Sequence, residues 1–208
     1  MTRQHITILG LGSLLSETSA RQSCPDLYNF RLAKVSGYRR VFNKIDSALV
    51  CSGESPADSR KCACLSAVPA SDIASMIVTA CEIPLSNWAG FVLREFEYRL
   101  VPVTYTELND NNKGGEAVLC MGDYTTDEAC EHIMYADAMR LQRWREFRAY
   151  YSGLMWRNDL LPKPSYLRFC LETARAYSHQ IYHNFITTTF VADGRTIAEY
   201  IDSENDWK

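Results

Sequence analysis

The sequence of 208 residues has no apolar run of the roughly 20 residues that a membrane-spanning helix needs. Its longest candidate, Ile6–Leu15, is shorter and is interrupted by Gly10 and Gly12. No basic run precedes this stretch and no small-x-small cleavage pattern follows it. We therefore expect no signal peptide and no membrane partner, and we expect a cytoplasmic location.

An excess of basic charge is also missing. The chain has 22 Lys and Arg against 25 Asp and Glu, which gives a net charge of −3. This balance argues against a protein that binds the phosphate backbone of nucleic acids. Arginines gather at positions 140, 143, 145 and 148, but acidic and aromatic residues separate them, so we interpret this stretch as a solvated helix face. We interpret the aromatic run Trp144–Trp156 as core packing rather than as a base-stacking surface.

Complete metal and disulfide patterns are absent. Eight cysteines in a chain of this size, without a secretory signal, are expected to be reduced thiols. Cys62 and Cys64 form a C-x-C with no second pair at zinc-site spacing. His179 and His183 are four residues apart, but no glutamate lies between them and no third ligand is evident, so we interpret them as two histidines on a helix face. We expect no metal. Four cysteines, at 81, 120, 130 and 170, have apolar neighbours and are predicted core residues.

Two other motifs are incomplete. Gly10-Leu11-Gly12 follows a predicted strand, but the third glycine of a dinucleotide loop would fall at Leu15. No G-x-S-x-G nucleophile elbow is present, so Ser13 is not a predicted nucleophile. We therefore expect no organic cofactor. The glycine turn is either a plain tight turn or a nest of backbone N–H groups that holds an anion.

The remaining pattern predicts strands in the first half of the chain and helices in the second. Alternating or β-rich runs predict strands at Ile6–Leu9, Ala33–Phe42, Cys62–Val68, Tyr98–Tyr105 and Glu116–Met121, the last two as a hairpin around the turn cluster 109–115. Caps and helical periodicity predict helices at Ser71–Ala80, Thr125–Tyr151 (with Thr126 as cap), Ser165–Phe185 and Thr196–Tyr200. This order favours an α+β domain over a doubly wound sheet.

Two carboxylates, Glu95 and Glu97, lie in an apolar setting just before a predicted strand. Burial disfavours the charged form of a carboxyl group and raises its pKa toward a value useful for proton transfer. If the segment is extended, both side chains share one face, and their like charges raise one pKa further. The alternative, which the residues alone favour, is an ordinary ion pair with Arg94.

Three segments in this order resemble the γ-glutamylcyclotransferase-like superfamily, including its ChaC branch. Ile8–Leu14 resembles the strand and "YGSL" loop that open these proteins, and Val35–Phe42 resembles their "GYRRVF" strand. Leu93–Val103 is similar to their "RE-x-x-Y-x-x-x-x-V" element. The match covers roughly residues 6–124, with a fainter echo at 184–201. Leu11 stands where the family usually has an aromatic residue, so the contribution of that ring to the substrate pocket is missing here.

The resemblance implies an α+β fold: a small mixed β-barrel with flanking helices (residues 1–124) and a C-terminal helical extension (125–208), in one compact domain. It implies cleavage of a γ-glutamyl amide or peptide by internal cyclisation to 5-oxoproline, as in glutathione metabolism, without a cofactor or metal. The glutamate after the arginine, Glu95, is the implied acid/base. The implied substrate-binding residues are Leu11, Gly12, Ser13, Leu14 and Tyr98.

For partners, we expect a small γ-glutamyl substrate, no nucleic acid, and a monomer or homodimer. Two alternatives remain. The barrel could be an inactive binding module, because folds are often reused without their chemistry. It could also be a pathway-specific enzyme that removes a γ-glutamyl group from one specialised amine.

Overall fold

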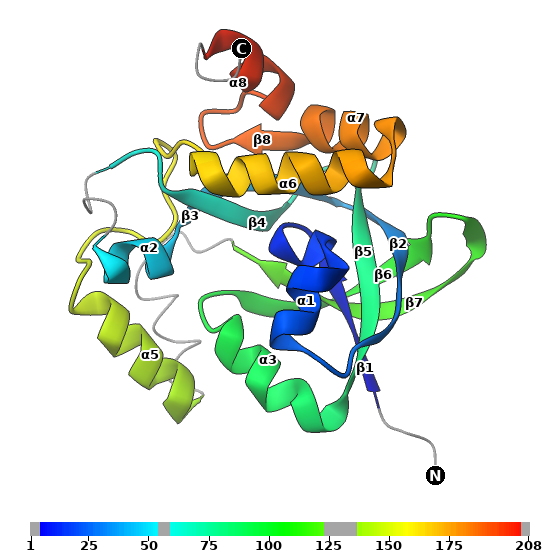
Figure 1. The fold of residues 1–208 in the computed structure, drawn as a ribbon, viewed down its shortest axis with the longest axis horizontal. Helices are drawn as coiled ribbons and strands as arrows, with labels where there is room; N and C mark the ends of the chain where they lie inside the picture. Colours follow the sequence, from blue (N-terminus) through cyan, green and yellow to red (C-terminus); the bar gives the residue numbers. More distant parts are fainter. Residues whose placement is uncertain (1–4, 54–58, 123–136, 205–208) are drawn as a thin grey trace.

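The computed structural model describes residues 5–53, 59–122 and 137–204 (Figure 1). Its strands are β1 (His5–Gly10), β2 (Tyr28–Ser36), β3 (Tyr38–Ile45), β4 (Ala63–Pro69), β5 (Ser75–Pro84), β6 (Arg99–Glu107), β7 (Asp110–Met121) and β8 (Thr189–Val191). Its α-helices are α1 (Glu17–Ser23), α2 (Ser47–Ser52), α3 (Trp88–Arg94), α5 (Ala138–Arg148), α6 (Pro164–Tyr177), α7 (His179–Thr188) and α8 (Ile197–Ser203). Two short 3₁₀ helices are η1 (Ser13–Leu15) and η2 (Leu85–Asn87).

Five strands close into a small barrel in the order β1-β5-β2-β6-β7, and β7 returns to β1. The closing contact pairs Ile8 with Val118 in parallel, whereas the other four pairings are antiparallel. The barrel is therefore mixed, and closure pairs the edge of β1 that would otherwise be open.

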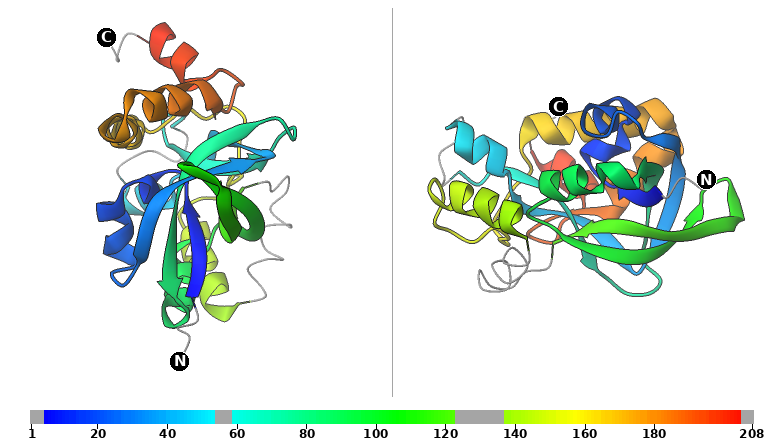
Figure 2. Two further views of the ribbon diagram at one scale, coloured as in Figure 1. Left: turned by 90° about the vertical axis from the view of Figure 1, so that its right-hand side faces the viewer. Right: turned by 90° about the horizontal axis from the view of Figure 1, so that it is seen from below.

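The sheet continues beyond the barrel from β7 through β4 and β3 to β8. Helices α6 and α7 lie side by side along this part of the sheet, and α7 also contacts β5 (Figures 1 and 2). The structure confirms the expected α+β architecture with a small mixed barrel and flanking helices. The C-terminal region adds more than helices, because β8 pairs in parallel with β3.

Two buried apolar clusters fill the molecule. The larger cluster joins strands of the barrel to C-terminal side chains such as Phe147, Leu167 and Phe185. The smaller cluster lies under α1 and α3 and includes Ile8 and Phe91. Within the described ranges, none of the helices has the length and apolar character needed to cross a membrane.

Three predicted elements differ from the structure. The predicted strand Ala33–Phe42 is two strands, because the chain turns at Gly37, whose φ of 78° is in the left-handed region that glycine tolerates. The predicted helix Ser165–Phe185 is broken at Ser178, which is extended and caps α7 by accepting a hydrogen bond from the Ile181 N–H. The predicted helix Ser71–Ala80 is wrong, since most of this segment belongs to β5.

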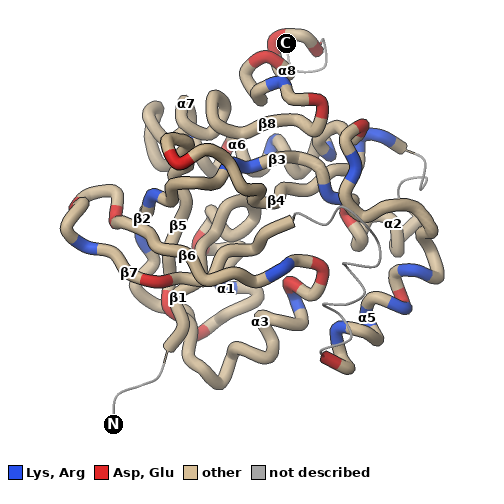
Figure 3. Tube along the Cα trace, turned by 180° about the vertical axis from the view of Figure 1, so that it is seen from behind, with Lys and Arg blue, Asp and Glu red and all other residues tan. Residues whose placement is uncertain are grey.

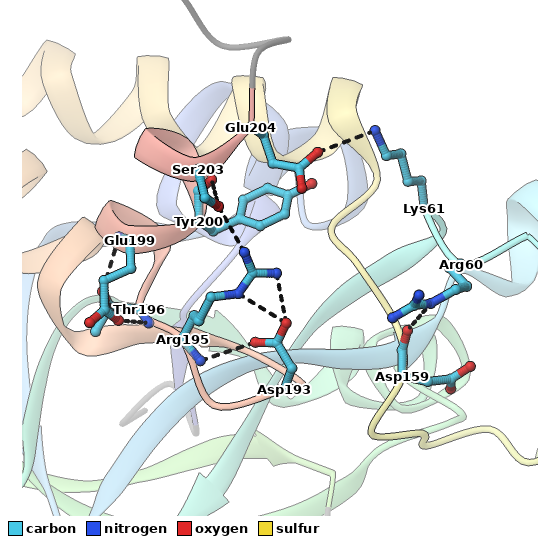
Figure 4. Close-up of polar contacts among 10 residues, drawn as sticks. All are labelled: Arg60, Lys61, Asp159, Asp193, Arg195, Thr196, Glu199, Tyr200, Ser203 and Glu204. Atoms are coloured by element: carbon cyan, nitrogen blue, oxygen red, sulfur yellow. Dashed lines mark hydrogen bonds and ion pairs between the residues drawn. The ribbon is translucent and has the colours of Figure 1, made fainter.

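The remaining predictions are closer to the structure. The hairpin of β6 and β7 is confirmed, but it turns at Leu108 and Asn109, so most of the predicted turn cluster is strand. Of the predicted helix Thr125–Tyr151, α5 is described, and Thr126 lies outside the described residues. Helix α8 begins after Thr196, whose side chain forms a reciprocal capping box with Glu199 (Figure 4).

The arginines of α5 are not all solvated. Several basic residues lie along this helix (Figure 3), and two of them, Arg143 and Arg145, are exposed. Arg140, however, is only 8% exposed and donates hydrogen bonds to the carbonyl oxygens of Phe96 (2.7 Å) and Tyr98 (2.6 Å). The interpretation of a fully solvated face is therefore wrong at Arg140, which instead ties α5 to the segment after α3.

Candidate active site

A small cavity of about 30 Å³ lies where the loop after β1, the end of α3 and the start of α6 meet. All the site residues that the resemblance implies line it: Glu95, Leu11, Gly12, Ser13, Leu14 and Tyr98. Four further residues complete the lining: Leu9, Leu65, Cys120 and Tyr166. Residues that are more than 150 positions apart in the chain therefore meet at one point.

The loop after β1 is anchored from both sides. Leu11 and Leu14 are 6% and 7% exposed and belong to different apolar clusters. The Thr79 hydroxyl donates a hydrogen bond to the Leu14 carbonyl oxygen at 2.8 Å. Position 10 must be glycine, because a Cβ there would lie 2.4 Å from both the Leu14 oxygen and the Thr79 hydroxyl. The backbone of Gly12 and Ser13 is thus held in place at the cavity.

Glu95 lies at the point where α3 ends. Its N–H donates to the Phe91 carbonyl oxygen, and its own carbonyl oxygen accepts from the Tyr98 N–H, both at 2.9 Å. The segment from Glu95 to Tyr98 is therefore a turn and not an extended strand. Glu95 and Glu97 do not share a strand face as the extended reading required, and their carboxylates have different ion-pair partners.

The pKa of the Glu95 carboxyl is raised, chiefly because the group is buried. Its side chain is 12% exposed. Nearby Arg94 and Lys44 oppose the rise in pKa, and the negative charge of Glu97 adds to it. A hydrogen bond with the Cys120 thiol also lowers the pKa. Burial outweighs the opposing groups, so the carboxyl remains more readily protonated than an exposed glutamate.

Arg94 contacts two parts of the site. One of its guanidinium nitrogens pairs with the Glu95 carboxylate, and another lies 3.3 Å from the Ser13 hydroxyl oxygen. The sequence left two alternatives, a carboxyl group with a raised pKa and an ion pair with Arg94. The structure has both. The Arg94 side chain is 27% exposed, so it lies at the solvent side of Glu95.

Glu97 is buried against Lys44. The Lys44 ammonium pairs with one Glu97 oxygen and donates to the Ile45 carbonyl oxygen at 2.9 Å. It also lies 5.1 Å from the centre of the Tyr98 ring. The other Glu97 oxygen, Oε1, is buried without a hydrogen-bond partner. Glu97 does not line the cavity with Glu95.

The two tyrosines of the cavity make different hydrogen bonds. The Tyr98 hydroxyl donates to the Leu65 carbonyl oxygen at 2.8 Å, so its hydrogen is not directed to Glu95. The Tyr166 hydroxyl oxygen accepts a hydrogen bond from the Ser13 N–H at 3.2 Å. Tyr166 was not predicted from the sequence, and neither was Cys120. No local motif surrounds either residue, and only the fold brings them to Glu95.

No group of three or more His, Cys, Asp or Glu in the described ranges is placed to hold a metal ion. His179 and His183 are both exposed on α7, with ring centres 6.4 Å apart. The seven described cysteines are free, and Cys81, Cys120 and Cys170 are buried as predicted. Cys130 lies outside the described residues.

The mixed barrel with flanking helices is the architecture that the sequence resemblance implies. No family model matches the chain. A search of curated proteins also gives no match. Solved structures with a similar fold include one titled "Gamma-glutamyl cyclotransferase", at 11% identity and a TM-score of 0.45, covering 73% of this chain and 94% of that one. An uncharacterised Homo sapiens protein has the same identity and TM-score, with 73% and 93% coverage.

A γ-glutamyl cyclotransferase from yeast, titled as specific to glutathione, is 14% identical with a TM-score of 0.40. It covers 85% of this chain and 98% of its own length. At these identities and TM-scores the similarities say nothing of activity, and the activity proposed below rests on the site.

Proposed function

We propose that this protein is a γ-glutamyl cyclotransferase that converts a γ-glutamyl amide or peptide into 5-oxoproline and a free amine, with Glu95 as the acid/base. The observation that carries the proposal is that the buried Glu95 carboxyl, with its raised pKa, lines one cavity with Gly12 and Ser13. The resemblance of the Ile8–Leu14 and Leu93–Val103 segments to the family supports the same assignment.

The reaction needs little from the protein. The α-amine of the substrate attacks its own γ-carbonyl carbon, and tethering gives this nucleophile a high effective concentration. The Glu95 carboxylate accepts a proton from the attacking amine and then donates it to the departing nitrogen. A carboxyl group with a raised pKa suits both steps, because it holds a proton more readily than an exposed glutamate.

Substrate entry requires a rearrangement at the cavity. A volume of about 30 Å³ holds roughly two water molecules, which is less than a glutamyl group. Arg94 is partly exposed and spans from Glu95 to Ser13. We expect this side chain to move away when substrate binds, and its departure would raise the pKa of Glu95 further, since Arg94 lowers it.

The test is the release of 5-oxoproline from a panel of glutathione, γ-glutamyl dipeptides and γ-glutamyl amines, measured by mass spectrometry. E95Q is expected to remain folded and to lose essentially all activity. E107Q is the matched control, because Glu107 is also paired with an arginine, Arg31, but does not line the cavity. E107Q should retain activity.

Each alternative has its own outcome in this assay. A binding module releases no 5-oxoproline from any substrate, which would contradict the proposal. Activity confined to one unusual γ-glutamyl amine would identify the pathway-specific enzyme. An active E95Q together with an inactive but folded E97Q would show that Glu97, and not Glu95, is the acid/base.

A further inference from the structure

Tyr166, in the first turns of α6, reaches the loop after β1 from the opposite end of the sequence. Helix α6 contacts η1, and the two lie close together in Figure 1. The Tyr166 hydroxyl oxygen accepts the Ser13 N–H and lies so close to Gly12 that a Cβ there would be 2.1 Å away. The ring meets Phe42 edge to face, with centres 6.1 Å apart. Backbone and ring contacts therefore fix the position of this hydroxyl at the cavity.

The hydrogen of this hydroxyl has only a weak acceptor. Its oxygen already accepts the Ser13 N–H. Its hydrogen is shared with the thiol of Cys170, one turn further along α6, and sulfur is a weak acceptor. The Tyr98 hydroxyl, by contrast, donates to a backbone oxygen. A substrate oxygen entering the cavity would offer the Tyr166 hydroxyl a stronger acceptor than the Cys170 thiol.

Burial keeps Tyr166 in its donor form. The pKa of its phenol is raised well above the usual value, first by burial and also by Cys170, Cys64 and Glu95. The hydroxyl therefore keeps its hydrogen at any pH at which the protein would work. Glu95 and Tyr166 line the same small cavity, so the carboxylate and the phenol can act on one bound substrate.

We propose that Tyr166 donates a hydrogen bond to the γ-carbonyl oxygen of the substrate and stabilises the oxyanion formed during cyclisation. This inference rests on the proposed function. The amine nitrogen bonds to the γ-carbon, the carbonyl π electrons move to oxygen, and Glu95 takes the amine proton. The carbonyl then re-forms, the bond to the leaving nitrogen breaks, and Glu95 returns the proton to that nitrogen. Tyr166 keeps its own hydrogen throughout and lowers the energy of the charged intermediate.

The direct test compares Y166F with Y177F. Y166F keeps the ring and removes the donor, and kcat is expected to fall on the order of 10²-fold with KM nearly unchanged, as for loss of one oxyanion donor. Tyr177, on the same helix, donates to the Leu15 carbonyl oxygen at 2.9 Å and does not line the cavity. Y177F, like Y166F, removes one hydrogen bond between α6 and η1, but it should keep its kcat. Equal losses in both variants would mean that Tyr166 only clamps the loop, which overturns the inference.

A second measurement does not depend on Y166F folding. Incorporating 3-fluorotyrosine at position 166 preserves shape and makes the phenol more acidic. Because the phenol keeps its hydrogen throughout the working pH range, the more acidic phenol is a stronger hydrogen-bond donor, and kcat at neutral pH should rise with KM nearly unchanged. An unchanged or lower kcat would overturn the inference.

The two proposals fail in different ways. Wild-type activity that is lost in E95Q but kept in Y166F would retain the cyclotransferase and reject the role of Tyr166. The absence of 5-oxoproline from every substrate would reject both.

Discussion

Glu95 and Glu97 are separated by a single residue, yet the turn after α3 gives their carboxylates different surroundings. Glu95 lies at the cavity beside Arg94, whereas Glu97 is buried against Lys44. The same substitution is therefore expected to affect chemistry at one position and folding at the other.

The raised pKa of Glu95 predicts the pH dependence of the reaction. The carboxylate must accept a proton, so kcat/KM falls as the pH drops through the pKa of Glu95. Because burial raises this pKa, the acid limb should have its midpoint above the value of an exposed glutamate, about 4.3. R94Q removes a charge that lowers the pKa, and the limb should move to higher pH. The measurement is a kcat/KM profile over pH.

R143Q is the control for this shift, because Arg143 is exposed on α5 and is not among the groups that perturb Glu95. Its profile should overlay that of the wild type. An R94Q limb displaced to lower pH would contradict the electrostatic assignment.

The buried ion pair between Lys44 and Glu97 predicts a large loss of stability when one partner is removed. The lysine and glutamate side chains are 3% and 8% exposed, and K44M would leave Glu97 buried without its counter-charge. The expected cost is about 3–5 kcal/mol in the free energy of unfolding, as for other broken buried pairs. K44M/E97L should recover much of this loss, since apolar pairs often replace buried ion pairs. Urea denaturation would measure both, and a K44M protein as stable as the wild type would show the pair to be dispensable.

The part of the site that could be predicted from sequence is the part carried by contiguous residues. Gly12–Leu14 and Glu95 belong to short motifs whose spacing is visible in the chain. Tyr166 and Cys120 reach the cavity only through the packing of α6 and the pairing of β7, and neither has a local signal. The different surroundings of Glu95 and Glu97 also depend on a turn that the apolar pattern did not reveal.

At the scale of elements, β5 shows why periodicity alone wrongly predicted a helix at Ser71–Ala80. Its residues Met76–Ile83 are all buried, because the strand is covered on both faces. Such a continuous apolar run fits a helix or a strand, and the serine at position 71 favoured a helix start. Ile73, which falls inside the predicted helix, is instead 94% exposed in the turn before the strand. The β-branched residues at 77–79 were the better guide.

The contact between α6 and the loop after β1 predicts that substitutions at Gly12 and Tyr166 are energetically coupled. G12A places a Cβ 2.1 Å from the Tyr166 hydroxyl oxygen, so the ring must shift, at a cost of roughly 1–3 kcal/mol as in other overpacked sites. In a Y166A background the ring is gone and most of this penalty should disappear. A double-mutant cycle on the free energy of unfolding measures the coupling.

Gly90 provides the control for this cycle. It lies in α3, and a Cβ there would meet nothing within 4 Å. G90A should be neutral or stabilising by up to about 1 kcal/mol, because alanine favours helix over glycine. Its effect should add to that of Y166A, and additivity for G12A as well would contradict the packing described here.

At the scale of the whole molecule, Arg40 connects the barrel to the C-terminal region. It is 1% exposed on β3 and donates to the Ile77 carbonyl oxygen at 2.7 Å and to the Thr189 hydroxyl at 3.0 Å. Its guanidinium lies 4.7 Å from the centre of the Phe185 ring. Burial lowers its pKa to about 10, so it remains charged near neutral pH. One side chain thus joins β3, β5, α7 and β8.

This connection predicts that residues 1–124 and 125–208 unfold together. Because β8 extends the sheet and the larger cluster spans both regions, neither can open without exposing the other's apolar surface. Calorimetry should show one transition whose calorimetric and van't Hoff enthalpies agree. R40M removes the donors to Ile77 and Thr189 and should lower the midpoint of that single transition. Two transitions, with R40M moving only one of them, would show instead that the C-terminal region is an independent unit and that Tyr166 reaches the cavity from a separable domain.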